Sequence, residues 1–174
     1  FSEIESAVSQ ANVIVLAVPS QHIRAVITKA KKHIDPSAII INIAKGIENE
    51  TLKIMSEVIF EVNGNISNYV TLSGPSHAEE VVSNMPTAVV AASKNIETSK
   101  IVQGLFSTNK FRVYTNEDLI GVEICGSAKN VIAIAAGFCD GFGYGDNTKS
   151  ALITRGMKEV ARLGLKSGAK FETF

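Results

Sequence analysis

Residues 126–131 (GSAKNV) place one amine and one amide in a stretch of small and apolar residues. Helical spacing puts Lys129 and Asn130 on one face with residues three or four positions apart, namely Glu123, Gly126, Ala133 and Gly137. The small residues of this face leave room for a ligand. A lysine in such surroundings loses hydration, which disfavours its ammonium form and suits it to exchange a proton with a carbonyl or alcohol oxygen. The alternative is a lysine that extends from a helix surface into solvent.

Two further segments carry polar groups directly after apolar runs that are typical of strands. They are Lys45-Gly46 and residues 73–78 (SGPSHA). In an open α/β sheet, ligands bind at the carboxyl ends of the strands, where Lys45 can reach an anion. Gly74 and Ser76 offer N–H and hydroxyl donors ahead of a helix N-terminus, which favours anions. The alternatives are a surface lysine beside a turn glycine, and a Gly-Pro turn in which Ser76 caps the helix.

The glycine-rich segment 141–147 (GFGYGDN) invites comparison with a nucleotide-binding loop, but it is not G-x-G-x-x-G and no strand precedes it. We interpret it as a turn between two helices, with Asp146 or Asn147 capping the second helix. A metal site is not predicted, because the candidate ligands lack metal-ligand spacing. These candidates are His22, His33, His77, Cys125 and Cys139.

Alternating patterns predict the elements that position these residues. Apolar runs indicate strands at 12–18, 38–43, 69–72, 88–92 and 111–114, and amphipathic spacing predicts helices at 2–11, 21–33, 51–62 and 96–106. A continuous apolar run, such as 12–18 after its first residue Asn12, is typical of a strand buried on both faces of a parallel sheet. The order predicts right-handed βαβ crossovers and a doubly wound α/β sheet.

Past residue 116 the pattern changes to helices alone, at 118–138 and 147–167. We therefore predict two domains, an α/β domain at 1–116 and the beginning of an all-helical domain at 117–174. The first residues include no initiator Met or signal peptide, and the last residues form no polar tail. At this stage we expect the sequence to be a piece of a longer chain.

Composition and charge exclude several classes of function. Lys plus Arg and Asp plus Glu both number 17 in 174 residues, and this neutral balance argues against nucleic-acid binding. Hydrophobic residues at 45% and charged residues at 20% are typical of a globular domain rather than a disordered chain. No apolar run approaches the ~18–20 residues of a membrane span. Two cysteines are too few for a disulfide framework and favour a reducing compartment.

Several of these segments together resemble one family, the NAD(P)-dependent glycerol-3-phosphate dehydrogenases, and the bacterial type best. The segments are NVIVLAVPSQ (12–21), NIAKGIE (42–48), LSGPSHAEEV (72–81), NMPTAVVAAS (84–93) and GSAKNVIAIAAGFCDGFGYGDNTKSALITRGMKEVARLG (126–164). They occur in the family's order and extend over essentially the whole chain. The resemblance implies a Rossmann-like sheet, NAD or NADP as cofactor, and hydride transfer to C2 of dihydroxyacetone phosphate or from sn-glycerol 3-phosphate.

The resemblance also implies roles for individual residues. Lys129 would be the general acid/base on the C2 oxygen, with Asn130 beside it in the substrate site. Lys45 would contact both substrate and cofactor near the reacting carbon. Gly74 and Ser76 would bind substrate, and Ala78 would touch the cofactor. The partner would be the small-molecule substrate, and the protein would bind no nucleic acid and have no membrane span. The resemblance further implies a cytoplasmic homodimer whose product supplies glycerophospholipid synthesis.

The chain departs from the family's pattern by omission. The family begins with a strand and a G-x-G-x-x-G-type loop, and this first βαβ unit is missing, together with the second strand that would discriminate NAD from NADP. The resemblance is therefore to a central fragment, which we expect to be inactive alone. Two alternatives stay open: another β-hydroxyacid dehydrogenase with a helical catalytic lysine, and a truncated non-catalytic module.

Overall fold

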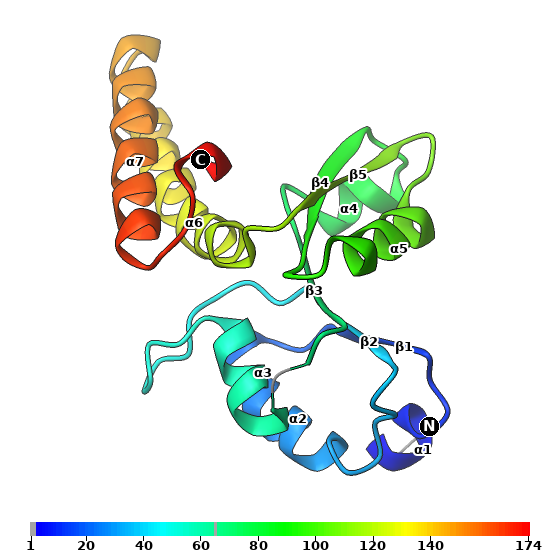
Figure 1. Cartoon of the computed structure of the whole chain (residues 1–174). Helices are drawn as coiled ribbons and strands as arrows, with labels where there is room; N and C mark the ends of the chain where they lie inside the picture. The colour runs from blue at the N-terminus through cyan, green and yellow to red at the C-terminus, as the bar shows by residue number, and fades with distance from the viewer. Residues whose placement is uncertain (1–2, 65) are drawn as a thin grey trace.

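The computed structural model describes residues 3–64 and 66–174, and its centre is a five-stranded sheet (Figure 1). The strands lie in chain order across the sheet: β1 (Val13–Leu16), β2 (Ile39–Asn42), β3 (Tyr69–Ser73), β4 (Thr87–Ala92) and β5 (Phe111–Asn116). β1, β2 and β3 are parallel, β4 is antiparallel to β3, and β5 is parallel to β4. The predicted α/β architecture is confirmed, with one reversal that the apolar pattern did not predict.

Helices cover the two faces of the sheet with separate cores. The connecting segments hold α1 (Ile4–Val8), the 3₁₀ turn η1 (Ser20–His22), α2 (Ile23–Ala30), α3 (Met55–Asn63), α4 (Ala78–Val82) and α5 (Ile96–Phe106). Successive strand residues point to opposite faces. Ile40 therefore joins the core under α2 and α3, whereas Ile41 joins the core that contains Val102 of α5.

Burial differs between the central strand and the edge strand. All five residues of β3 are buried, as expected for a strand covered on both faces. In β1, Ile14 and Leu16 are buried, but Val13 and Val15 are 37% and 43% exposed. The prediction that this run is buried on both faces is therefore wrong, because β1 lies at the edge of the described sheet and the described helices cover one of its faces.

The reversal between β3 and β4 is visible in the pairing of the two strands. The connection, residues 74–86, contains one helix, α4, of five residues. The chain re-enters the sheet antiparallel to β3, with Ser73 paired to Val90 and Thr71 paired to Ala92.

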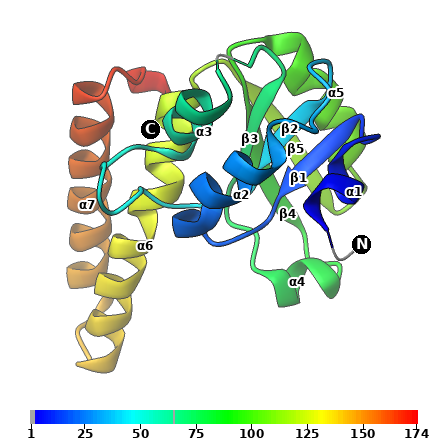
Figure 2. The ribbon, with the colours of Figure 1, turned by 90° about the horizontal axis from the view of Figure 1, so that it is seen from below.

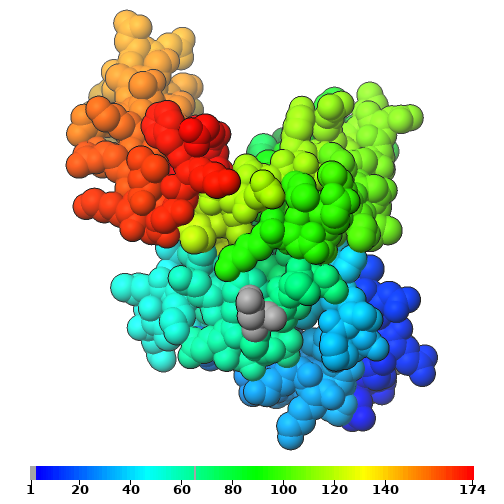
Figure 3. All heavy atoms as spheres, in the orientation of Figure 1, coloured from blue at the N-terminus to red at the C-terminus, as the bar shows by residue number. Residues whose placement is uncertain are grey.

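Two long helices follow the sheet, α6 (Leu119–Gly141) and α7 (Asp146–Lys166), with a 3₁₀ turn η2 (Phe171–Thr173) at the end. The first turns of α6 contact β3, and α7 packs along α6 (Figure 2). The far ends of both helices project beyond the α/β part (Figure 3). Gly156 of α7 lets the helices approach, since a Cβ there would lie 2.8 Å from Cγ1 of Ile132.

The glycine-rich segment 141–147 forms the predicted turn, but the residue at the N-cap of α7 differs from the prediction. Gly141 is the last residue of α6, and the turn occupies 142–145. The N-cap of α7 is Gly145, without a side-chain cap bond, and Asp146 lies in the first turn. The predicted capping by Asp146 or Asn147 is therefore wrong. Instead, Lys149 Nζ donates to Asp140 Oδ1 at 2.8 Å across the turn.

α6 is long and apolar enough to cross a membrane by length and composition, although a third of the relevant segment is buried inside the protein. The helix carries Glu123 and Lys129, and its first half packs against the sheet. We therefore describe α6 as the helix that joins the α/β and helical parts.

Candidate active site

Three segments that are distant in sequence meet at the carboxyl ends of β2 and β3. Lys45 follows β2, Ser76 follows β3, and Lys45 Nζ lies 3.4 Å from Ser76 Oγ. α6 closes against both loops, because the N–H of Gly46 donates to Ser127 Oγ at 3.1 Å. Parallel strands place their carboxyl ends at one edge, which is why two loops predicted to carry polar groups lie together.

Gly126 is the point of closest approach between α6 and β3. A Cβ at this position would lie 2.4 Å from Ser73 Oγ, a distance that real side chains do not adopt. Both residues are buried. The glycine therefore lets the helix backbone come directly against the end of the strand, which brings the following residues of α6 to the strand-end loops.

Lys45 is half-buried, and its pKa is lowered from the ordinary value, first by burial and then by the positive charge of Lys129. The geometry agrees, since a Cβ on Gly126, three residues before Lys129 on α6, would lie 4.0 Å from Lys45 Cγ. Two cations brought together from separate elements repel one another, and an anion between or beside them relieves that repulsion. The site is therefore suited to an anionic ligand.

Lys129 is half-buried and Asn130 is exposed, with Lys129 Nζ donating to Asn130 Oδ1 at 3.4 Å. The helix face predicted from spacing is divided by the structure. Glu123 and Gly126 are buried, whereas Gly137 is exposed near the far end of α6. The division follows from length, since α6 contacts the sheet along its first turns and then extends beyond it.

The glycines that follow the strands have steric roles of their own. Gly46 has φ +147°, and a Cβ there would lie 2.5 Å from Ser20 Oγ. A Cβ on Gly74 would lie 2.8 Å from the carbonyl oxygen of Ala88 in β4. The positive φ and the Ser20 side chain thus favour glycine at position 46, and the β4 backbone favours it at position 74, whereas the predicted role of Gly74 in substrate binding stays a prediction.

Ser76 does not cap α4. The N-cap of α4 is His77, without a side-chain cap bond, and Ser76 Oγ instead lies 3.4 Å from the carbonyl oxygen of Gly74. The structural alternative considered for Ser76 is therefore not adopted. Its hydroxyl also accepts from Lys45 Nζ at 3.4 Å, so it lies beside the amine that would bind an anion.

A cleft of about 640 Å³ opens beside Lys45. Lys45, Ser76 and Ala78 line it, and most of its walls are apolar. Among the other lining residues are Val15, Leu72, Val89, Phe106, Lys110 and Phe111. An apolar cleft with a cation and a hydroxyl at one end fits a ligand that has a flat apolar part and a polar reacting end, as a nicotinamide cofactor does.

Ser127 is a site residue that sequence reasoning missed. Its hydroxyl accepts from the N–H of Gly46 and donates to the carbonyl oxygen of Glu123 at 2.8 Å, so it links α6 to the Lys45 loop. A serine four residues after its carbonyl acceptor is a recognisable helical pattern. The partner on the distant loop, however, has no signal in the sequence.

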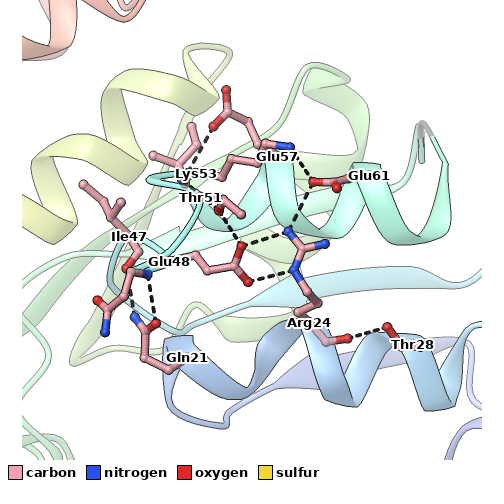
Figure 4. Close-up of polar contacts among 11 residues, drawn as sticks. Gln21, Arg24, Thr28, Ile47, Glu48, Thr51, Lys53, Glu57 and Glu61 are labelled. Carbon is pink, nitrogen blue, oxygen red and sulfur yellow. Dashed lines mark hydrogen bonds and ion pairs between the residues drawn. The ribbon is translucent and has the colours of Figure 1, made fainter.

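An ion-pair network holds the loop that follows Lys45 (Figure 4). Arg24 of α2 makes two hydrogen bonds to the Glu48 carboxylate, each 2.8 Å. Gln21 donates to the carbonyl oxygen of Ile47 at 2.8 Å and accepts from the N–H of Asn49 at 3.0 Å. These contacts fix the loop to α2 immediately after Gly46, and so limit the positions that Lys45 can take.

We expect Glu48→Gln to destabilise the protein at neutral pH and to have little effect in strong acid. Hydrogen bonds from Arg24 and then from Thr51 lower the pKa of Glu48 from 4.5 to about 2. A carboxyl with a lower pKa in the folded chain stabilises the fold above pH 4.5, and this stabilisation is lost as the pH falls towards 2. Urea unfolding at neutral pH and near pH 2 measures the difference.

Glu50→Gln is the matched control for this experiment, because Glu50 is an exposed carboxyl on the same loop with no ion pair among residues 3–64 and 66–174. It should leave the urea midpoint unchanged at both pH values. A Glu48→Gln deficit that is as large near pH 2 as at neutral pH would contradict the assignment.

Fold and site together define a class, an α/β protein whose Rossmann-like sheet is joined to a helical region that brings a lysine to the strand-end loops. The family model described as the NAD-dependent glycerol-3-phosphate dehydrogenase N-terminus matches residues 1–99, and the model for the C-terminus of the same family matches residues 118–174. The chain belongs to the NAD-dependent glycerol-3-phosphate dehydrogenase family. The predicted resemblance is confirmed.

Individual relatives agree with this assignment. The chain is 54% identical over 174 residues to the glycerol-3-phosphate dehydrogenase [NAD(P)+] of Clostridium botulinum, covering 100% of this chain and 52% of the relative. It is similar to the crystal structure of glycerol-3-phosphate dehydrogenase from Coxiella burnetii, with a TM-score of 0.91 and 40% identity over 99% of this chain and 53% of that one. The structure of Plasmodium falciparum glycerol-3-phosphate dehydrogenase is also similar, with a TM-score of 0.86 and 30% identity, covering 94% of this chain and 46% of that one. The chain spans about half the length of the curated relatives it matches.

Proposed function

We propose that the protein containing this chain transfers a hydride between NAD(P)H and C2 of dihydroxyacetone phosphate, forming sn-glycerol 3-phosphate reversibly. The observation that carries the proposal is that α6, which bears Lys129, packs on the loop of Lys45, and that Lys45 lines an apolar cleft in a chain of this family. The names of the relatives support the same substrate and cofactors. The alternative of another β-hydroxyacid dehydrogenase is not favoured by any of the relatives just described.

The residues present fit the cofactor, since the cleft is largely apolar and Lys45, Ser76 and Ala78 are among the residues that line it. When bound there, the reduced nicotinamide supplies the hydride. Ala78 would lie against the cofactor, where a small side chain lets the ring approach the cleft wall. Lys45 would contact both cofactor and substrate, because its amine is at the end of the cleft nearest to α6.

Lys129 would be the general acid in the direction of reduction. Addition of a hydride to C2 leaves negative charge on the C2 oxygen, which takes a proton from the Lys129 ammonium to form the alcohol. In the reverse direction the neutral amine accepts that proton. Before the proton moves, the cation stabilises the developing alkoxide. Asn130 beside it, with Gly74 and Ser76 on the opposite loop, would hold the rest of the substrate.

Replacing Lys45 with methionine should lower kcat/KM for dihydroxyacetone phosphate by about 10- to 100-fold, mainly through KM. The reason is that hydrogen bonds to charged groups contribute about 1.5–3 kcal/mol. Initial-rate kinetics with varied substrate measure the change. Lys32→Met is the matched control, since Lys32 is an exposed lysine that does not line the cleft. Equal losses in the two variants would contradict a specific role for Lys45.

We further propose that residues 1–116 and 117–174 act as cofactor-binding and substrate-binding parts. The change from α/β to all-helical structure between β5 and α6 supports this division. Family membership supports the further proposals that the protein is a cytoplasmic homodimer and that its product enters glycerophospholipid synthesis.

Turnover of three substrates tests the proposed function. The protein should oxidise NADH or NADPH with dihydroxyacetone phosphate, and it should not reduce NAD⁺ or NADP⁺ with 3-hydroxyisobutyrate or 6-phosphogluconate. Turnover of either hydroxyacid without dihydroxyacetone phosphate would favour the other β-hydroxyacid dehydrogenases. Binding of cofactor without turnover of any of the three would favour a non-catalytic module.

A further inference from the structure

Glu123 is a buried carboxylate to which the proposed reaction assigns no role. It lies on α6 with 5% of its surface exposed, and it accepts hydrogen bonds from two other elements. Tyr69 and Thr71 of β3 donate their hydroxyls to Oε1 at 2.9 and 2.5 Å. Ser56 of α3 donates its hydroxyl at 2.7 Å and its backbone N–H at 3.1 Å to Oε2.

The four donors replace the water that the carboxylate loses on burial. Burial raises the pKa of Glu123, whereas the hydrogen bonds from Thr71, Ser56 and Tyr69 act in the opposite direction. Among the ion pairs of the described residues, none involves Glu123. The N–H of Ser56 belongs to the first turn of α3, where a helix leaves donors unpaired and favours an anion. Glu123 of α6 thus caps the N-terminus of α3 in the α/β part.

This arrangement specifies one placement of α6. Rotation of the helix by one residue would put Ile124 or Val122 in place of Glu123 and leave four buried donors without an acceptor. An apolar side chain could fill the same volume, but it would not distinguish one rotation from another in this way. The anchored residue lies roughly 9 Å along the helix axis from Lys129, and Gly126 and Ser127 make their contacts in between.

We propose that Glu123 is the positioning residue that sets the register of α6 against β3 and α3, and thereby holds Lys129 beside Lys45. The proposal rests on the function proposed above for Lys129. Its effect passes along a continuous line of contacts, from the carboxylate to Gly126 against Ser73, and then from Ser127 to the Lys45 loop.

Paired variants of two buried carboxylates of the same helix test the proposal. Asp118 is the control. Its carboxylate oxygens accept hydrogen bonds from the N–H groups of Gly121 and Lys170 and from the hydroxyl of Thr173, away from the strand-end loops. Glu123→Ala should lower kcat by about 100-fold, as expected for a misplaced catalytic group. Asp118→Ala should lower the melting temperature but keep kcat within about threefold of the unmodified protein. The kcat of each variant is measured well below its melting temperature and is normalised to the concentration of sites that bind NADH.

Glu123→Gln tests for rescue. An amide can accept from the Ser56 N–H and donate to the hydroxyls of Tyr69 and Thr71, which can turn to accept. This variant should therefore recover kcat to within about tenfold of the unmodified protein. Where Glu123→Ala does not fold, Thr71→Val removes a single donor and should give an intermediate loss. Equal kcat in Glu123→Ala and Asp118→Ala, or in Thr71→Val and the unmodified protein, would overturn the proposal.

Amide hydrogen exchange separates this proposal from the function on which it rests. The Gly46 N–H donates to Ser127 Oγ, which protects it from exchange. Ser127→Ala removes this hydrogen bond and therefore gives the exchange rate of the unprotected Gly46 amide. Glu123→Ala should accelerate Gly46 exchange towards that rate, by about tenfold or more, whereas Asp118→Ala should not. Unchanged Gly46 exchange in Glu123→Ala would overturn the positioning role. Absence of dihydroxyacetone phosphate turnover in the unmodified protein, with accelerated exchange in the variant, would overturn the proposed function alone.

Discussion

Replacement of Lys129 by alanine is expected to lower kcat by about 10²- to 10⁴-fold, which is the usual contribution of a positioned proton donor. Under the proposed function, the C2 oxygen receives its proton from this amine, and the methyl group of alanine has no proton to give. The fold should survive the change, because Lys129 is half-buried and its one hydrogen bond within the described residues is the 3.4 Å contact with Asn130. KM for NADH should change little.

Steady-state kinetics in both directions measure the effect, with melting temperature as a check on folding. Lys158→Ala is the matched control, since Lys158 is an exposed lysine on α7. Lys129→Arg keeps the positive charge but does not release a proton readily, so it should also lose most of kcat. Near-normal kcat in Lys129→Ala would refute the assignment of this lysine as the general acid/base.

Replacement of Gly126 by alanine is the second change with a large expected effect. The added Cβ would lie 2.4 Å from Ser73 Oγ, so the Ser73 hydroxyl must turn away within a buried site, or α6 and the end of β3 must move apart. Overpacking of this kind costs about 1–3 kcal/mol of stability. Because Lys129 follows on the same helix, a shift of about 1 Å there should also reduce kcat by about 100-fold. Urea unfolding and initial rates measure the two effects.

A second substitution identifies the clash as the cause. Ser73 Oγ is buried and has no hydrogen-bond partner within the described part of the chain, so Ser73→Ala should cost little by itself. In the double variant the new Cβ would meet Ser73 Cβ at 3.6 Å, which is ordinary contact. Ser73→Ala should therefore restore most of the stability and kcat lost in Gly126→Ala. Strictly additive losses in the double variant would show that the clash is not responsible.

The sequence predicted most of the secondary structure because the apolar runs have clear ends. The helix predicted at 96–106 agrees in both bounds with α5, and the strand predicted at 88–92 lies within β4. The prediction was wrong where burial depends on neighbours. The run at 12–18 is apolar at every position after Asn12, yet Val13 and Val15 are partly exposed at the edge of the described sheet.

Direction within the sheet was also outside what the pattern could give. A run such as 88–92 has the same composition whether it lies parallel or antiparallel to β3. Only the pairing in the folded chain shows that β4 runs antiparallel to β3. The roles of the loop glycines also could not be predicted from the sequence pattern. Gly74 suggested a donor for a ligand, but close packing against Ala88 gives it a steric reason of its own.

The sequence by itself determined the family, the alternation of strands and helices, and the segments that carry Lys45, Ser76 and Lys129. These features are local, since each depends on the types and spacing of neighbouring residues. Only the tertiary structure decided that the Lys45 loop meets α6 through Ser127, and that Glu123 binds donors from β3 and α3. Such contacts join residues far apart in the chain. Their geometry depends on how closely two backbones approach, which no single segment encodes.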